Sequence, residues 1–110
     1  GTGDQIRDYI HVSDTVRAFL FAGFHKNSNG KVYNLAGGHP TSIKQLTRKI
    51  IETMKIKTKI TYTGKSWKGD IMNLTANVEK IKLDIGFMPK VKFEEGIIRT
   101  TNWLNENLSR

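Results

Sequence analysis

Four segments of the chain have the spacing of apolar residues that is typical of amphipathic α-helices. They cover residues 13–25, 42–55, 77–86 and 93–108. Ser42 and Gln45 form an S-x-x-Q capping box at the start of the second helix, and Asn77 is placed to cap the third, which Gly86 ends. The inward faces predicted for the second and fourth helices consist of Ile43, Leu46, Ile50 and Met54, and of Ile97, Thr101, Leu104 and Leu108.

The first of these helices, which Ser13 or Asp14 is predicted to cap, is apolar over more of its surface than a surface helix needs to be. One stripe consists of Val12, Val16, Phe19, Leu20 and Phe24, and a second stripe beside it consists of Ala18, Phe21 and Ala22. An ordinary surface helix buries a single stripe against its own core. The pair of stripes therefore indicates a surface that another domain or subunit covers; burial within one small core is the alternative.

Three short segments have the alternation or the residue types of β-strands. They are Arg7–Val12, Val32–Ala36 and Lys59–Thr63. Strands that alternate with helices along a chain predict a layered fold. We therefore expect an α/β protein, in the form of a small α+β-like domain that covers residues 1–110.

The chain is basic, with 18 Lys and Arg against 10 Asp and Glu and a formal net charge of +8. Such an excess is common in proteins that bind nucleic acids, anionic membranes or phosphorylated ligands. Here the basic residues are spread along the chain without a dense run, so most are expected at a solvated surface, and nucleic acid is not the favoured partner.

The chain has no cysteine, which excludes disulfides and thiolate metal sites, and the cytoplasm is its expected location. No apolar run approaches the roughly 20 residues of a membrane-spanning helix, so no membrane partner is expected. The histidines His11, His25 and His39 lack the spacing of metal ligands, and no G-x-S-x-G motif is present. Neither a metal site nor a catalytic residue is predicted.

The remaining candidate chemistry lies in loops that suit an anionic ligand. The fork of Arg7 can donate two parallel hydrogen bonds to a phosphate. The Gly37-Gly38 turn leads to the positive end of the helix that starts at Ser42, and the loop of residues 67–70 ends at Asp70, a possible acceptor for sugar hydroxyls.

Each of these features also has a purely structural interpretation. Arg7 can pair with Asp8 or Asp4, Asp70 can fix its own turn, and Trp67 can simply pack.

Several motifs follow one another in a distinctive order. They are RDYIHV-x-D at residues 7–14, VYNLAGG-x-x-TSI at 32–43, Gly-Asp at 69–70, DIGFMPK at 84–90 and EEGI at 94–97. This order resembles the C-terminal part of the extended short-chain dehydrogenase/reductase family, the NAD-dependent epimerases and dehydratases of nucleotide sugars. The resemblance covers essentially all 110 residues.

The resemblance implies a division of labour between two domains. In that family an N-terminal Rossmann domain binds NAD, and a smaller C-terminal domain, to which this chain is similar, binds the nucleotide diphosphate sugar. The family's catalytic Tyr-x-x-x-Lys pair is absent, since the residues four positions after the three tyrosines are Ser13, Gly37 and Ser66. The chain alone is thus expected to be inactive in hydride transfer. It is also expected to bind no cofactor; NAD or NADP, oxidation at sugar C4 and homodimer formation would belong to a full-length parent.

The resemblance also implies roles for individual residues. The arginine of the family's RD[YF]IHV motif contacts the substrate diphosphate and is Arg7 here, and the residue at the TS-[IV] helix start, Ile43, packs on the nucleotide base. The family's R-x-G-D loop brings an arginine to the phosphates and an aspartate to the ribose. The aspartate is Asp70, but Trp67 stands at the arginine position, followed by Lys68. Lys68 would offer a point charge in place of a fork, and Trp67 could stack on a base or ring.

Two functions of other classes stay open at this point. One is a small basic domain that binds nucleic acid, which requires the lysines to gather on one face. The other is a protein-interaction module whose apolar first helix docks a partner.

Overall fold

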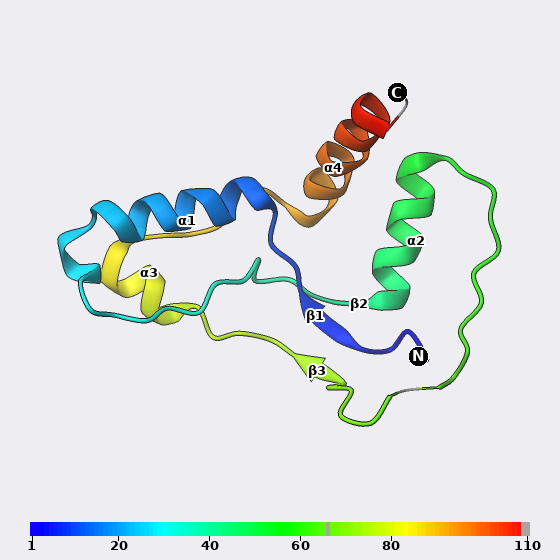
Figure 1. Cartoon of the computed structure of the whole chain (residues 1–110), viewed down its shortest axis with the longest axis horizontal. Helices are drawn as coiled ribbons and strands as arrows, with labels where there is room; N and C mark the ends of the chain where they lie inside the picture. The colour runs from blue at the N-terminus through cyan, green and yellow to red at the C-terminus, as the bar shows by residue number, and fades with distance from the viewer. Residues whose placement is uncertain (66, 109–110) are drawn as a thin grey trace.

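The computed structural model describes residues 1–65 and 67–108; Ser66, one of the residues four positions after a tyrosine, lies outside the described residues. The elements along the chain are β1 (Ile6–Asp8), α1 (Val12–Phe24), a 3₁₀ helix (Lys26–Ser28), β2 (Pro40–Ser42), α2 (Ile43–Met54), β3 (Asn73–Leu74), α3 (Glu79–Ile85) and α4 (Phe93–Leu108). The predicted α/β fold class, with helices interleaved with short strands, is confirmed. Figure 1 shows α1 and α3 together on one side of the small sheet and α2 and α4 on the other.

The sheet has the strand order β2-β1-β3. Strand β1 pairs antiparallel with β2, where Ile6 lies opposite Ser42, and parallel with β3, where Ile6 lies opposite Asn73. Because β1 is central, it joins the start of α2 to the segment that precedes α3 (Figure 1). The first predicted strand is therefore present but ends at Asp8, and its last residue, Val12, begins a helix.

The strands predicted at residues 32–36 and 59–63 are wrong. Tyr33 and Leu35 do turn toward the core, and Val32 turns away from it, so the alternation of side chains is present. However, a strand also needs a neighbour for its backbone hydrogen bonds. Neither segment has such a neighbour among the described residues.

The start of α1 differs from the prediction as well. His11 is the N-cap, and its Nδ1 accepts a hydrogen bond from the backbone N–H of Ser13. Asp14 is instead buried, and its carboxylate accepts from the N–H groups of Lys90 at 2.9 Å and Val91 at 2.7 Å and pairs with Arg17. Burial would raise the pKa of the Asp14 carboxyl, but these N–H groups and the guanidinium outweigh it and hold the pKa below its ordinary value.

The hydrophobic core lies between α1 and α3. It consists of Ala18, Ile81, Ile85 and Phe87, with Ala22, Tyr33, Leu35 and Val78 packed around them. The Phe87 ring is fully enclosed and meets the edge of Phe21 with ring centroids 5.7 Å apart. As predicted, α3 ends at Gly86, whose φ of 68° favours glycine. The predicted cap at Asn77 is wrong by one position, since Val78 is the N-cap; Asn77 Oδ1 still accepts from the N–H of Glu79.

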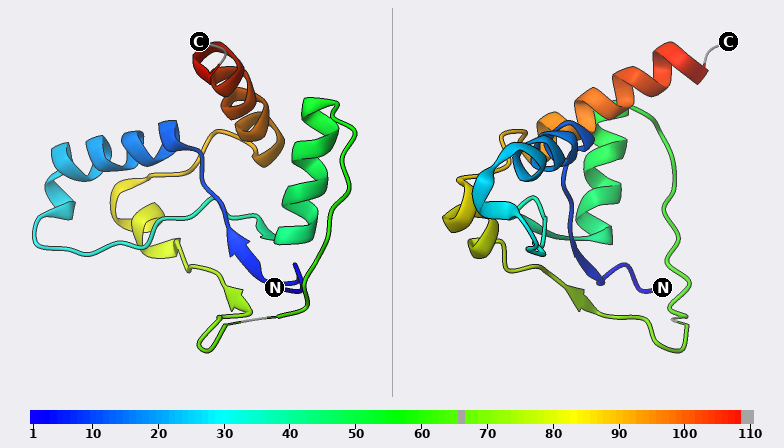
Figure 2. Two further views of the ribbon diagram at one scale, coloured as in Figure 1. Left: turned by 45° about the vertical axis from the view of Figure 1, so that its right-hand side comes forward. Right: turned by 60° about the vertical axis from the view of Figure 1, so that its left-hand side comes forward.

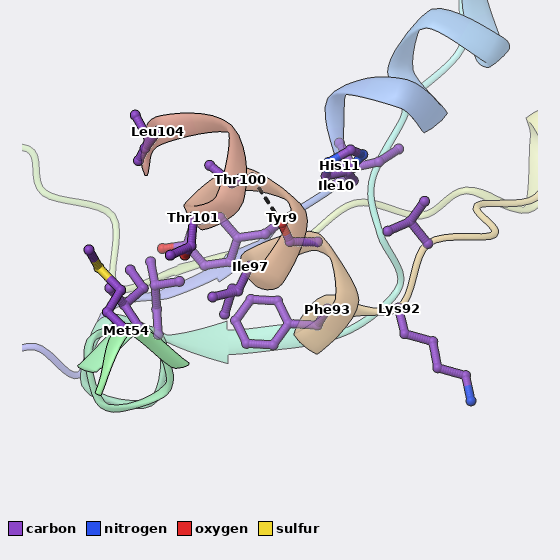
Figure 3. A pocket seen from close by; sticks show the side chains of 14 residues that line it. Tyr9, Ile10, His11, Met54, Lys92, Phe93, Ile97, Thr100, Thr101 and Leu104 are labelled. Carbon is purple, nitrogen blue, oxygen red and sulfur yellow. Dashed lines mark hydrogen bonds between the residues drawn. The ribbon is translucent and has the colours of Figure 1, made fainter. Parts of the chain in front are cut away.

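Helices α2 and α4 pack on each other and have the predicted ends (Figure 2). The capping box of Ser42 and Gln45 is present, and α4 buries Ile97 and Thr101. Leu108, by contrast, is exposed, and no residue of α2 is fully buried. An apolar cavity of about 260 Å³ lies between the two helices; it is lined by Leu46, Ile50, Met54, Phe93, Ile97 and Leu104, among others (Figure 3).

The outer face of α1 is uncovered. The stripe of Ala18 and Ala22 packs on the core, whereas Phe19 and Phe24 in the other stripe are 72% and 88% exposed. The whole chain is also open: its radius of gyration is 16.6 Å, against about 13 Å for a compact domain of this length. Its accessible surface of 8354 Å² exceeds by roughly 2,000 Å² that of a compact monomer of the same mass. In the described part of the chain, no helix is both long and apolar enough to cross a membrane.

Candidate functional site

A polar cavity lies where β1, the start of α2, residues 60–63, Lys65 and residues 67–70 meet. Its volume is about 490 Å³. Four of the five predicted site residues line it: Arg7, Ile43, Trp67 and Asp70. The fold thus brings together residues that are up to 63 positions apart in the sequence. Strand β1 lies beside β2, which leads directly into α2, and it also lies beside β3, which follows the loop of Asp70.

Arg7 is held firmly but keeps part of its donor capacity. Its Nη1 donates to the carbonyl oxygens of Ile6 and Ile71, both at 2.7 Å, and its Nη2 lies 3.5 Å from Asp70 Oδ1. A guanidinium has five N–H donors in a planar fork. Among the described residues, the Nε–H and one N–H of Nη2 have no protein partner, so a fixed cationic edge is left for an anion in the cavity.

Asp70 is fixed from two sides. Its side chain is only 8% exposed, and while Oδ1 faces Arg7, Oδ2 accepts a hydrogen bond from Gln5 Nε2 at 2.6 Å. Each carboxylate oxygen can accept more than one hydrogen bond. Asp70 therefore has acceptor positions left for a hydroxyl group of a ligand, within the geometry that Gln5 and Arg7 impose.

The partners that local sequence offered to Arg7 are engaged elsewhere. Asp8 Oδ1 accepts from the N–H groups of Gly38 at 2.8 Å and His39 at 3.2 Å, and Asp4 pairs with Lys44 at 2.7 Å. The ion pair of Lys44 holds the pKa of the Asp4 carboxyl below its ordinary value. The interpretation in which Arg7 pairs with Asp8 or Asp4 is therefore wrong; Asp70 is its acidic neighbour.

The Gly37-Gly38 turn does not line this cavity, and its donor is already used. Asp8 takes the N–H of Gly38, and a Cβ atom at Gly37 would lie 1.9 Å from the carbonyl oxygen of Tyr9. Gly37 therefore serves close packing of the backbone just after β1, whereas Gly38 supplies a φ of +79° that favours glycine. The anion site that the sequence suggested at this turn is not formed.

Of the two loop residues Trp67 and Lys68, only Trp67 lines the cavity. Trp67 lines it with a side chain that is 71% exposed, whereas Lys68 points to solvent and is not among the lining residues. Lys65 lines the cavity in its place. A second cationic contact, if the ligand has one, comes from Lys65 more readily than from Lys68.

Besides Lys65, sequence reasoning missed two further parts of the site. The Gln5 side chain donates a hydrogen bond to the Asp70 carboxylate. The Tyr62 ring packs on Gly3, where φ is +81° and a Cβ atom would lie 2.4 Å from Tyr62 Cε1. Lys44 Nζ lies 5.4 Å from the centre of the Tyr62 ring. Only Gly3 carried a signal of its own, as a glycine at a position that no turn pattern required.

The apolar cavity between α2 and α4 is a poorer candidate for an anionic ligand. Its few hydroxyl groups are those of Tyr9, Thr100 and Thr101, and the Thr100 hydroxyl donates to the carbonyl of Gly96 within its own helix (Figure 3). Among the described residues, no three His, Asp or Glu side chains gather in a way that would hold a metal ion. The polar cavity beside Arg7 is therefore the candidate functional site.

The sequence profile of the GDP-mannose 4,6-dehydratase family matches residues 1–100 of the chain. The chain belongs to this family. Its resemblance to the nucleotide-sugar epimerases and dehydratases of the extended short-chain dehydrogenase/reductase type is confirmed.

Relatives of this member of the GDP-mannose 4,6-dehydratase family include dehydratases and epimerases. The dTDP-D-glucose 4,6-dehydratase of Bos taurus is 32% identical over 114 residues, which cover 97% of the chain and 31% of that protein. A putative UDP-glucose 4-epimerase of Methanocaldococcus jannaschii is 29% identical over 107 residues, which cover 97% of the chain and 33% of that protein.

Solved structures share the fold. UDP-glucose 4-epimerase of Thermotoga maritima, in complex with UDP-glucose, superimposes with a TM-score of 0.89 at 31% identity over 98% of the chain and 34% of that structure. The dTDP-glucose 4,6-dehydratase of Bacillus anthracis, in complex with NAD, superimposes with a TM-score of 0.84 at 32% identity over 99% of the chain and 34% of that structure. The chain spans about a third of the length of the proteins it matches.

Proposed function

We propose that residues 1–110 are the C-terminal, substrate-binding part of a longer NAD-dependent nucleotide-sugar epimerase or dehydratase, which we call the full-length enzyme. The observation that supports this most is the geometry of Arg7, whose guanidinium is anchored on two carbonyl oxygens and which lines a cavity of about 490 Å³. A planar cation held in this way suits the oxygens of a diphosphate.

The other lining residues supply the rest of the recognition. Ile43 and Trp67 offer apolar and aromatic surface to a base, and the Asp70 carboxylate offers acceptors to ribose hydroxyls. Diphosphate contacts would then hold the sugar in place for oxidation at C4. Binding energy from the remote nucleotide is thereby converted into orientation of the reacting sugar.

We place the NAD site and the catalytic residues outside residues 1–110. The chain has no Tyr-x-x-x-Lys pair, and its Gly1-Thr2-Gly3 segment does not fit a pyrophosphate loop. Gly3 is covered by Tyr62, and the backbone of Gly1 bonds to Thr63 and Gly64. The cofactor, NAD or NADP, would supply the hydride acceptor from the preceding Rossmann domain of the full-length enzyme.

The outer face of α1 would be covered by that preceding domain. The chain covers about a third of its relatives and exposes roughly 2,000 Å² more surface than a compact monomer of its mass. An excess of that size matches an obligate interface between parts of one protein. A full-length enzyme would form its homodimer through other surfaces.

The function is tested by the affinity of the full-length enzyme for UDP, dTDP and GDP, measured by isothermal titration beside its affinity for NAD. The replacement Arg7→Ala is expected to weaken binding of the tightest of these nucleotides by about 1.5 to 3 kcal/mol, the range for hydrogen bonds to charged groups. The affinity for NAD should stay unchanged. Arg99→Ala is the control, since Arg99 also pairs with an acid, Glu95, but lies on α4 away from the cavity. Equal nucleotide affinities for both variants and the wild type would refute the assignment.

A further inference from the structure

Gln5 is a buried polar residue that the proposed contacts with the ligand do not use. It is 7% exposed and lies immediately before β1, where its carbonyl oxygen accepts from the N–H of Ile43 at 3.0 Å. Its side chain reaches across 65 positions of sequence to Asp70. Gln5 thus connects the three parts of the chain that form the cavity: β1, the start of α2 and the loop that ends at Asp70.

The two contacts of the Asp70 carboxylate differ in length. Gln5 Nε2 lies 2.6 Å from Oδ2, at the short end for an N–H donor, whereas Arg7 Nη2 lies 3.5 Å from Oδ1. An arginine and a carboxylate that are free to approach form two parallel hydrogen bonds of about 2.7 to 2.9 Å. Arg7 and Asp70 do not form that bidentate arrangement, since their one contact is 3.5 Å long. Gln5 instead holds the other oxygen of the carboxylate.

We infer that Gln5 is a positioning residue that keeps Asp70 from closing a bidentate ion pair with Arg7. Without the amide of Gln5, the buried carboxylate has a single cationic partner and turns its second oxygen toward it. The Nε–H and Nη2 donors of Arg7 are then occupied by Asp70 and lost to a diphosphate. This inference rests on the proposed function, since it concerns the availability of Arg7 to an anionic ligand.

The test is a set of variants in the full-length enzyme, with the nucleoside diphosphate that the wild type binds most tightly as the probe. Gln5→Met keeps the length of the side chain and removes its donor, and the expected loss of affinity is about tenfold. In an Asp70→Asn background the same change should alter the affinity by less than about twofold, because an amide cannot form the bidentate ion pair. The NAD affinity should stay constant throughout.

Gln45→Met is the matched control. Gln45 has the same side chain but closes the capping box at Ser42, so its replacement should lower the stability of the fold and leave nucleotide affinity unchanged. If Gln5→Met fails to fold, Gln5→Glu serves in its place: it keeps the shape, puts a second carboxylate beside Asp70 and should lose at least about tenfold in affinity.

The outcomes separate the inference from the function on which it rests. If Arg7→Ala weakens nucleotide binding but Gln5→Met binds as the wild type does, the role of Gln5 is refuted and the proposed function stands. If Gln5→Met loses the same affinity in the wild-type and Asp70→Asn backgrounds, Gln5 acts only as structural support, and the inference fails. If neither the wild type nor Arg7→Ala binds a nucleoside diphosphate, both the inference and the function fail.

Discussion

Two arginine–aspartate pairs in the structure serve different ends. Arg17 pairs with Asp14 in α1, and Arg7 pairs with Asp70 across the sheet, and the two arginine side chains are almost equally exposed, at 29% and 28%. Exposure alone therefore does not tell a structural pair from a binding one. The difference lies in the remaining contacts of each member.

In the first pair the carboxylate is fully engaged by the fold, and the guanidinium packs on aromatic rings. Asp14 is 1% exposed and accepts two backbone N–H groups besides the guanidinium, and Arg17 lies over the rings of Phe21 and Phe87 at 5.8 and 5.3 Å. In the second pair the contact is longer, and both Arg7 and Asp70 line a cavity. An ion pair whose two members both line a cavity is the stronger indication of a ligand site.

The largest effect that would test this contrast is expected at Asp14. Replacement Asp14→Ala leaves two N–H groups and the Arg17 guanidinium without their acceptor, so the free energy of unfolding should fall by about 3 to 5 kcal/mol, the cost of breaking a buried pair. Urea denaturation followed by circular dichroism measures it. A loss below about 1 kcal/mol, close to the effect of an ordinary surface substitution, would contradict the structural role.

The same residue predicts the direction of a pH effect. Because the pKa of Asp14 is lowered in the folded state, its contribution is complete above the ordinary carboxyl pKa of about 4 and is lost as the pH falls below it. Asp14→Asn should therefore flatten the acid limb of the stability profile, measured as the free energy of unfolding at a series of pH values. An acid limb of unchanged slope would show that Asp14 does not titrate in this way.

A smaller effect is expected on the outer face of the same helix. Phe19→Ala should cost little in residues 1–110 alone, where the ring is exposed, but about 2 kcal/mol in the full-length enzyme, where we propose that the preceding domain buries it. Thermal unfolding of both forms, with Asp14→Ala as a reference that destabilises both, measures the difference. An equal, small effect in the two forms would show that another domain does not cover α1.

The smallest effect is expected in the loop at residues 67–70. Trp67→Ala should weaken nucleotide binding by about 1 kcal/mol through lost stacking, whereas Lys68→Ala should change it by less than about 0.3 kcal/mol, because Lys68 lies outside the cavity. Isothermal titration of the full-length enzyme compares the two. A larger loss of affinity for Lys68→Ala than for Trp67→Ala would contradict the placement of Trp67 inside the cavity and of Lys68 outside it.

The parts of the fold that local chemistry decides were predictable from the sequence. The capping box of Ser42 and Gln45, the end of α3 at Gly86 and the span of α4 from Phe93 to Leu108 all follow from side chains within one or two turns. The strands predicted at residues 32–36 and 59–63 failed because pairing depends on a neighbour that the pattern of a single segment does not reveal.

The candidate site shows the same limit. Arg7, Ile43, Trp67 and Asp70 came from motifs in a recognised order, and the fold brings all four to one cavity. Gln5 is joined to that cavity by a hydrogen bond to Asp70, 65 positions away, so no local signal marked it. Lys65 lies in the same loop as Trp67, but the motif pointed to Lys68. Asp14 was expected as a helix cap because an acidic residue at a helix start usually is one, but burial gave it other partners.

The proposed role of Arg7, to hold the diphosphate of a nucleotide sugar, decides whether the polar cavity is the substrate site. The decisive measurement is a crystal structure of the full-length enzyme with a bound nucleoside diphosphate. We expect diphosphate oxygens within hydrogen-bonding distance of Arg7 Nε and Nη2, with Asp70 still bonded to Gln5. A diphosphate bound away from β1, with Arg7 closed onto Asp70, would contradict this role.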